Sequence, residues 1–339
     1  MLTILAAVFV FGVLVTVHEF GHFITAKLTG MRVDEFAIGF GPAIYKKQEG
    51  ETLYSLRAIP LGGFNRIAGM DPEDPVEPDS FKGKPIPARM LVILAGAIMN
   101  FILPVLLFSG IFMFDGITRV VDQPIVGQAM VGRAASVAGV RDGDLILSIN
   151  GQKLSTWHEV IAATKANGTK EMTMVCKTKE GAGKEFKVTP VYNKELGRAL
   201  VGISPKFEKK ALGPMESVKM GFSYTERVMV AMVDGLKNMV TGRSKVEVSG
   251  PIGVAQAAGQ VAEQGILPLL NFVAFLSINL GVINLLPLPA LDGGHFILLV
   301  LEFFRGKPLG AKAMNNIQMA GVVLILAITI FSTFKDITR

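Results

Sequence analysis

The stretch LTILAAVFVFGVLVTVHEFGHFITAK, residues 2–27, places two histidines and a glutamate near the end of a long apolar run. About 20 apolar residues suffice to cross a bilayer as a helix, so this stretch predicts a membrane span. His18 and His22 are one helical turn apart, and both imidazoles can therefore hold one Zn²⁺ on the same helix face. Glu19 between them can accept a proton from a water bound to such a metal. Because ionisable groups at membrane depth are costly, we interpret these three residues as functional.

The composition is that of a membrane protein. Half of the 339 residues are hydrophobic and only 18% are charged, and the mean hydropathy is +0.46. The net charge of +6 is not gathered in a dense basic block, so we attribute it to membrane topology and lipid contact and expect no nucleic-acid partner. The single cysteine, Cys176, excludes an intrachain disulfide and a Cys₂His₂ zinc site. No Lys or Arg precedes Lys27, so the first apolar run is interpreted as a retained span and not a signal peptide.

Apolar runs predict four membrane spans. They cover residues 2–26, 90–114, 267–288 and 318–334. Residues 30–89 predict a membrane-associated β-region followed by a polar loop. Its two strands are expected at 31–45 and 52–66, with a hairpin turn at 48–50 between them.

Residues 115–212 differ from the rest, because their hydrophobic runs are short and alternate with charged and turn residues. They predict a soluble domain inserted between spans. Residues 213–266 are amphipathic and predict helices on the membrane surface; the alternative is that part of them packs on the soluble domain. The predicted segments are 1–29 (first span), 30–89 (cytoplasmic β-region and loop), 90–114 (second span), 115–212 (soluble domain), 213–266 (surface helices), 267–292 (third span), 293–317 (cytoplasmic connection) and 318–339 (fourth span and C-terminus).

Basic residues predict the orientation. Arg305, Lys307 and Lys312 lie in the short connection between the third and fourth spans, and further basic residues follow the first span. The positive-inside rule places both connections in the cytoplasm. The N-terminus, the inserted domain and the C-terminus are then expected on the outer side.

A catalytic zinc needs a third protein ligand and an open position for water. Asp292 is the only carboxylate between Glu263 and Glu302, and it is expected at the cytoplasmic end of the third span. His22 is expected at the same end of the first span, so the two side chains can meet. Asp292 could equally cap the helix that follows, a role that is compatible with metal ligation.

The residues around Asp292 have a polar and helix-breaking character that is unusual for a span. Pro287 and Pro289 interrupt the helix and free backbone groups beside the expected site. For Asn279, hydrogen bonding between helices and a substrate contact are both open. We favour a substrate contact for Asn284. His295 is expected either to be a packing residue or to donate a hydrogen bond to one of the metal ligands from outside.

Together, these motifs resemble the site-2 protease family of intramembrane zinc metalloproteases. The resemblance rests on His18–His22 and on the run from Asn284 to Gly293 with its two prolines. Bacterial members close to this pattern carry a PDZ domain between the second and third spans, and residues 138–151, AGVRDGDLILSING, resemble the core PDZ signature. The stretches 39–42 and 60–64 match the family's membrane-associated β-region. The resemblance implies zinc ligands at His18, His22 and Asp292, a general base at Glu19, and residues near the substrate at Asn279, Asn284, Pro287 and Pro289.

The implied fold is an α-helical membrane protein with four transmembrane helices, a membrane-associated β-region and an inserted extracytoplasmic PDZ domain of α+β class. The implied activity is that of a zinc metalloendopeptidase in the inner or plasma membrane, with its active site near the cytoplasmic face. It would cleave the transmembrane segments of single-span proteins, such as anti-sigma factors or remnant signal peptides. The PDZ domain would bind the substrate C-terminus or exclude uncut substrates. The alternative is a non-catalytic zinc-binding scaffold or carrier, which has no need of a base at Glu19.

Overall fold

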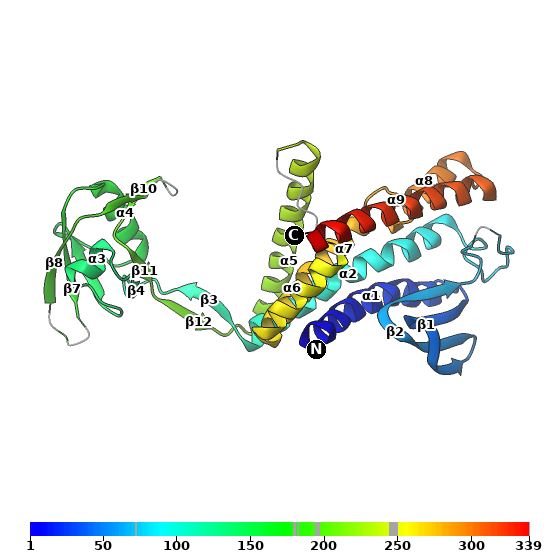
Figure 1. The fold of residues 1–339 in the computed structure, drawn as a ribbon, viewed down its shortest axis with the longest axis horizontal. Helices are drawn as coiled ribbons and strands as arrows, with labels where there is room; N and C mark the ends of the chain where they lie inside the picture. Colours follow the sequence, from blue (N-terminus) through cyan, green and yellow to red (C-terminus); the bar gives the residue numbers. More distant parts are fainter. Residues whose placement is uncertain (72, 179–180, 182, 194–196, 244–249, 339) are drawn as a thin grey trace. The chain divides into compact units, whose positions relative to one another are not determined.

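The computed structural model describes residues 1–71, 73–178, 181, 183–193, 197–243 and 250–338. The chain divides into two compact units, one formed by residues 1–113 with 213–339 and the other by residues 114–212. Within the described residues of the first unit, four helices are long and apolar enough to cross a membrane (Figure 1). These helices are α1 (Leu2–Leu28), α2 (Ile86–Phe114), α7 (Ile266–Asn284) and α9 (Ala311–Thr338).

Helices α1 and α2 approach closely along the part of α1 that carries the histidines. A Cβ added at Gly21 of α1 would lie 2.4 Å from the carbonyl oxygen of Ala95 in α2. Small residues permit such close packing. Close packing drives helix association in membranes, because lipid removes the usual hydrophobic driving force. Helix α2 begins at Ile86 with Pro87 in its first turn, where the missing amide N–H costs nothing.

The predicted β-region is one long antiparallel hairpin of β1 (Val33–Glu49) and β2 (Thr52–Ile67), which packs along α1. Phe36 is paired with both Asn65 and Tyr54, so the hairpin folds over itself and the start of β1 lies between two segments of β2. Buried Glu35 ties these segments together. Ser55 Oγ and Arg57 Nη2 each donate to its Oε1 at 2.6 Å. Burial alone would raise the pKa of Glu35, but these donors hold it below its usual value.

The predicted third span, residues 267–292, is wrong at its end. Helix α7 ends at Asn284, and Asp292 is the first residue of a separate helix, α8 (Asp292–Arg305). The turn between them contains two prolines and Ala290, whose φ of 69° is left-handed. Within the predicted connection 293–317, the structure has most of α8 and the start of α9. Polar residues such as Lys312 fall within the first turn of α9, where a helix can leave the apolar layer, so hydropathy alone placed its start too late.

The predicted surface helices, α5 (Pro214–Val240) and α6 (Pro251–Glu263), belong to the helical unit and not to the inserted domain. Helix α6 packs on α1, where Gly259 meets the side chain of Thr3. Its N-terminus is held by Asp336 of α9, whose carboxylate accepts hydrogen bonds from the backbone N–H groups of Gly250 and Gly253. Helix α5 packs on α7 and α2, with the rings of Tyr224 and Phe108 4.7 Å apart.

The inserted unit is a small α+β domain. Its largest described sheet has the strand order β6-β5-β7-β8, and two short helices accompany it. The core is built around Trp157, Ile146, Met174 and Cys176. Burial raises the pKa of the Cys176 thiol to about 12, consistent with an inert packing residue. The elements are β3 (Ile117–Val120), β4 (Val126–Ala129), α3 (Ala134–Ala138), β5 (Leu145–Ile149), β6 (Gln152–Lys153), α4 (Trp157–Asn167), β7 (Met172–Lys177), β8 (Gly183–Val188), β9 (Val191–Asn193), β10 (Arg198–Leu200), β11 (Ile203–Pro205) and β12 (Phe207–Lys210).

Candidate metal centre

The two histidines of α1 present their ring nitrogens to one point. His18 and His22 are four positions apart in α1, so both side chains lie on one face of the helix. Their Nε2 atoms lie 3.2 Å apart. Both residues are buried, with exposed fractions of 9% and 8%. The rings are perpendicular, with centroids 4.8 Å apart, so the two nitrogens converge without stacking of the rings.

Asp292 of α8 completes the group. Its Oδ2 lies 3.5 Å from His18 Nε2 and 3.6 Å from His22 Nε2, and this buried oxygen has no hydrogen-bond partner among the described residues. Ligand atoms about 2.0–2.2 Å from a tetrahedral zinc are separated from one another by about 3.3–3.6 Å. The three observed separations are close to that value. Two imidazoles and a carboxylate also leave one tetrahedral position open, so these residues fit a catalytic zinc.

Residues of α2 hold both imidazoles from behind. The Nδ1 of His22 is 2.8 Å from the carbonyl oxygen of Val92. A carbonyl can only accept, so Nδ1 donates and Nε2 keeps its lone pair for a metal. The Nδ1 of His18 lies 3.0 Å from the side-chain amide of Asn100. Ser277 Oγ of α7 donates to the backbone carbonyl of Asn100 at 2.8 Å. The sequence alone did not indicate this role for Asn100.

Gly96 is the residue of α2 that lies directly against the rings of His18 and His22. A Cβ at this position would lie 2.4 Å from His22 Nε2 and 2.6 Å from His18 Cε1. Real Cβ atoms do not approach other atoms so closely, so only glycine fits without displacing the rings. The sequence does not predict this contact of Gly96 with the histidines, because small residues are common wherever membrane helices pack.

Among the described residues, it is the hairpin that supplies the hydrogen-bond partner of the Glu19 side chain. The side-chain amide of Asn65 in β2 donates to Glu19 Oε2 at 2.8 Å and to the Glu19 carbonyl oxygen at 2.6 Å. Gly63 of the same strand lies beside the Glu19 side chain, since its Cβ would be 3.7 Å from Glu19 Cγ. Sequence reasoning assigned stretch 60–64 to the family's β-region and did not single out Asn65.

The other predicted residues lie around the turn between α7 and α8. Asn279 and Asn284 are five residues apart on α7, about 140° around the helix, so they face different directions. Asn284 is buried, with an exposed fraction of 9%, and Asn279 is half-buried. Pro289 packs against Gly321 of α9, whereas Pro287 is exposed. The structure thus gathers the metal-binding group and Glu19, while these four positions are spread along the adjoining segment.

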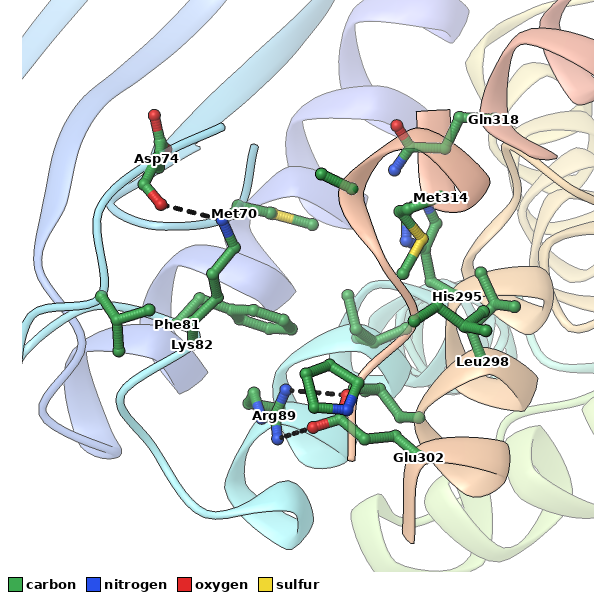
Figure 2. A pocket seen from close by; sticks show the side chains of 16 residues that line it. Met70, Asp74, Phe81, Lys82, Arg89, His295, Leu298, Glu302, Met314 and Gln318 are labelled. Atoms are coloured by element: carbon green, nitrogen blue, oxygen red, sulfur yellow. Dashed lines mark hydrogen bonds and ion pairs between the residues drawn. The ribbon is translucent and has the colours of Figure 1, made fainter. Parts of the chain in front are cut away.

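A separate pocket of about 450 Å³ opens where α2, α8 and the start of α9 meet the loop before α2 (Figure 2). His295 lines it, and burial lowers the pKa of this imidazole, with a smaller contribution from His22. The guanidinium of Arg89 forms two hydrogen bonds with Glu302, at 2.6 and 3.2 Å. Their side chains are only 10% and 12% exposed. This ion pair joins α2 to the helix that begins with Asp292.

Replacing either member of this ion pair should destabilise the helical unit. Arg89→Met leaves the Glu302 carboxylate buried without its partner, which costs roughly 3–5 kcal/mol in such pairs. The double variant Arg89→Met with Glu302→Leu should lose clearly less than the sum of the single variants, because no unpaired charge remains. Thermal unfolding of the detergent-solubilised protein checks this prediction. Strictly additive losses would show that the pair does not couple α2 to α8.

The helical unit, with two histidines and a carboxylate brought together beside a glutamate, defines a membrane zinc metallopeptidase. The family model described as Peptidase family M50 matches residues 6–328. The chain therefore belongs to peptidase family M50, and it is a zinc metalloprotease.

Two similar proteins have names that agree with this assignment. The chain is 32% identical to the regulator of sigma-W protease RasP of Bacillus subtilis, in an alignment that covers 99% of this chain and 98% of that protein. It is 31% identical to the zinc metalloprotease RasP of Geobacillus kaustophilus, with the same coverage of each chain. The PDZ domain of an SdrC-like protein from Listeria monocytogenes matches 26% of this chain and 90% of its own length, at 18% identity and a TM-score of 0.23.

Proposed function

We propose that this protein is an intramembrane endopeptidase that cleaves the transmembrane segments of single-span membrane proteins. The observation that carries the proposal is the convergence of His18, His22 and Asp292 beside Glu19, within a unit built from apolar helices. We assign the three ligands to zinc and Glu19 to the role of general base. A carboxylate between the ligands is what a hydrolase needs and a zinc carrier does not.

A zinc ion bound at this site supplies Lewis acidity towards water and the scissile carbonyl. Glu19 takes a proton from the attacking water and later delivers it to the leaving amine. Asn65 holds the Glu19 carboxylate for this transfer. Peptide bonds in a helical substrate are engaged in i→i−4 hydrogen bonds, so the substrate must unwind before it is cut. The β-region beside Glu19 offers a strand with which the unwound segment can pair, and we assign to Asn284 the role of satisfying freed backbone groups.

The proposed orientation places the metal site near the cytoplasmic face and the inserted domain outside. Arg305, Lys307 and Lys312 support it, since all three lie between the end of α8 and the first turn of α9, as the positive-inside rule requires of a cytoplasmic connection. The proposed substrates include anti-sigma factors, in line with the name of the Bacillus subtilis relative, and remnant signal peptides.

For the inserted domain we favour binding of a substrate end over exclusion by size. A groove of about 380 Å³ runs between α4 and β10–β11. Apolar side chains such as Ile161 and Leu200 line it, together with the cationic Lys165 and Arg198, and no acidic residue is among its described lining. An apolar groove with positive charge suits an extended peptide that ends in a carboxylate.

Zinc content and activity should rise and fall together in the purified protein. We expect one zinc per chain by elemental analysis, and cleavage of a model single-span substrate in proteoliposomes. Removing the metal with a chelator should abolish cleavage, and adding zinc should restore it. Asp292→Ala should lose both zinc and activity, because two imidazoles alone bind the metal weakly. A protein that holds zinc but cleaves no span in a panel of membrane proteins would instead support the carrier or scaffold.

A further inference from the structure

Asn65 lies at the point where the hairpin meets the catalytic motif. It is half-buried on β2 and is paired with Phe36 of β1. Its amide nitrogen donates two hydrogen bonds, and both acceptors are oxygens of Glu19. A backbone carbonyl oxygen and an ionised carboxylate oxygen can only accept, so the NH₂ end of the Asn65 amide is the end that faces Glu19.

The opposite end of the same amide has no hydrogen-bond partner among the residues that the structure describes. Asn65 Oδ1 is buried, and no described donor reaches it. Buried polar atoms in folded proteins are nearly always hydrogen-bonded, and one that is not calls for an explanation. An oxygen that is shielded from solvent and lies next to the general base is suited to accept an N–H that arrives with the substrate.

The bond to the carboxylate does more than attach the strand to the helix. The contact with the Glu19 carbonyl oxygen alone would join β2 to α1. The second contact, to Oε2, restricts rotation of the carboxylate and leaves Oε1 for proton transfer. A carboxylate that is already oriented loses less freedom in reaching the transition state, which is how a positioning residue accelerates a reaction.

We propose that Asn65 has two roles, both resting on the function proposed above. Its NH₂ group is a positioning element for Glu19, and its Oδ1 accepts a backbone N–H of a substrate strand that pairs beside residues 63–66. One side chain thereby couples docking of the unwound substrate to the orientation of the base.

Two substitutions separate these roles. Asn65→Leu keeps the volume but removes both polar ends, so kcat should fall about tenfold or more, and KM should rise several-fold. Asn65→Asp keeps an acceptor in place of Oδ1 but replaces the donor with a second carboxylate oxygen, so kcat should fall while KM stays near that of the unsubstituted protein. Zinc content and melting temperature should be unchanged in both. Asn271→Leu, at an exposed asparagine of α7, is the matched control and should alter none of these values.

A second readout does not depend on cleavage. In a Glu19→Gln background, which traps substrate, Asn65→Leu should reduce the amount of model substrate that co-purifies, and Asn65→Asp should retain it. The inference is overturned if Asn65→Leu cleaves with kcat and KM within twofold of the unsubstituted protein. It is also overturned if both variants lose zinc or melt early, because Asn65 would then be only a structural tie. If the unsubstituted protein itself does not cleave, it is the proposed function that fails.

Discussion

Glu19→Gln is expected to abolish peptide-bond cleavage while leaving the zinc site filled. Glutamine has the same shape as glutamate but cannot take a proton from water, and general-base catalysis contributes about 10²–10⁴-fold to hydrolysis. The three proposed ligands are unchanged, and the glutamine carbonyl can still accept the hydrogen bond from Asn65 that Glu19 Oε2 now accepts. Cleavage of a single-span substrate in proteoliposomes and zinc per chain by elemental analysis measure the two effects separately.

The same variant also serves to identify substrates. A protein that binds spans without cutting them should retain its natural substrates during purification, and mass spectrometry of the co-purified membrane proteins would name them. The matched control is the protein with Asp292→Ala, which is inactive through loss of metal and not through loss of the base. Cleavage by Glu19→Gln at more than about a tenth of the unsubstituted rate would show that another group is the base.

Gly96→Ala is expected to disrupt the metal centre from the opposite side. The added methyl group would lie 2.4 Å from His22 Nε2 and 2.6 Å from His18 Cε1, so at least one ring must move. The His22 ring is also held by the carbonyl of Val92, which prevents a small compensating rotation. Disturbing the groups that orient metal ligands typically costs 10–100-fold in affinity or activity, and direct intrusion between two ligands should exceed that. Zinc retention during dialysis against a weak chelator and cleavage rate both test it.

The same helix provides the control for this experiment. Gly110 also lies in α2, but a Cβ there would meet no atom within 4 Å. Gly110→Ala has the same effect on helix propensity and should leave zinc binding and cleavage unchanged. Equal effects of the two substitutions would show that Gly96 of α2 does not lie against the metal site as described.

Much of the helical framework was predictable, because the signal for a membrane span is strong and local. A run of about 20 apolar residues has few alternatives to a spanning helix, and the four candidate helices fall where the runs are. The boundaries were less predictable. The start of α9 was placed too late, since polar residues in its first turn, such as Lys312, lower the mean hydropathy without breaking the helix. The end of α7 was placed too late because hydropathy continues through Leu285–Leu291, where proline ends the helix.

The metal-binding group was predictable in part, and for two different reasons. His18 and His22 share a face because helical periodicity alone brings positions four apart together. Asp292 was predicted from its depth and its isolation among apolar residues, and from family resemblance. That these three side chains lie within reach of one cation is, by contrast, a property of how α1 and α8 pack.

The sequence by itself determined the class of protein: an apolar chain with a zinc motif in its first span, a carboxylate shortly after its third, and a polar domain inserted between spans. These features depend on composition and on spacing within single elements. Only the tertiary structure revealed what surrounds the motif. Asn100, Gly96 and Asn65 act across elements distant in the chain, and nothing in their own local sequence distinguishes a packing residue from one that contacts His18, His22 or Glu19. Their roles arise from close approach of helices and strand, which is decided by the packing of the whole unit.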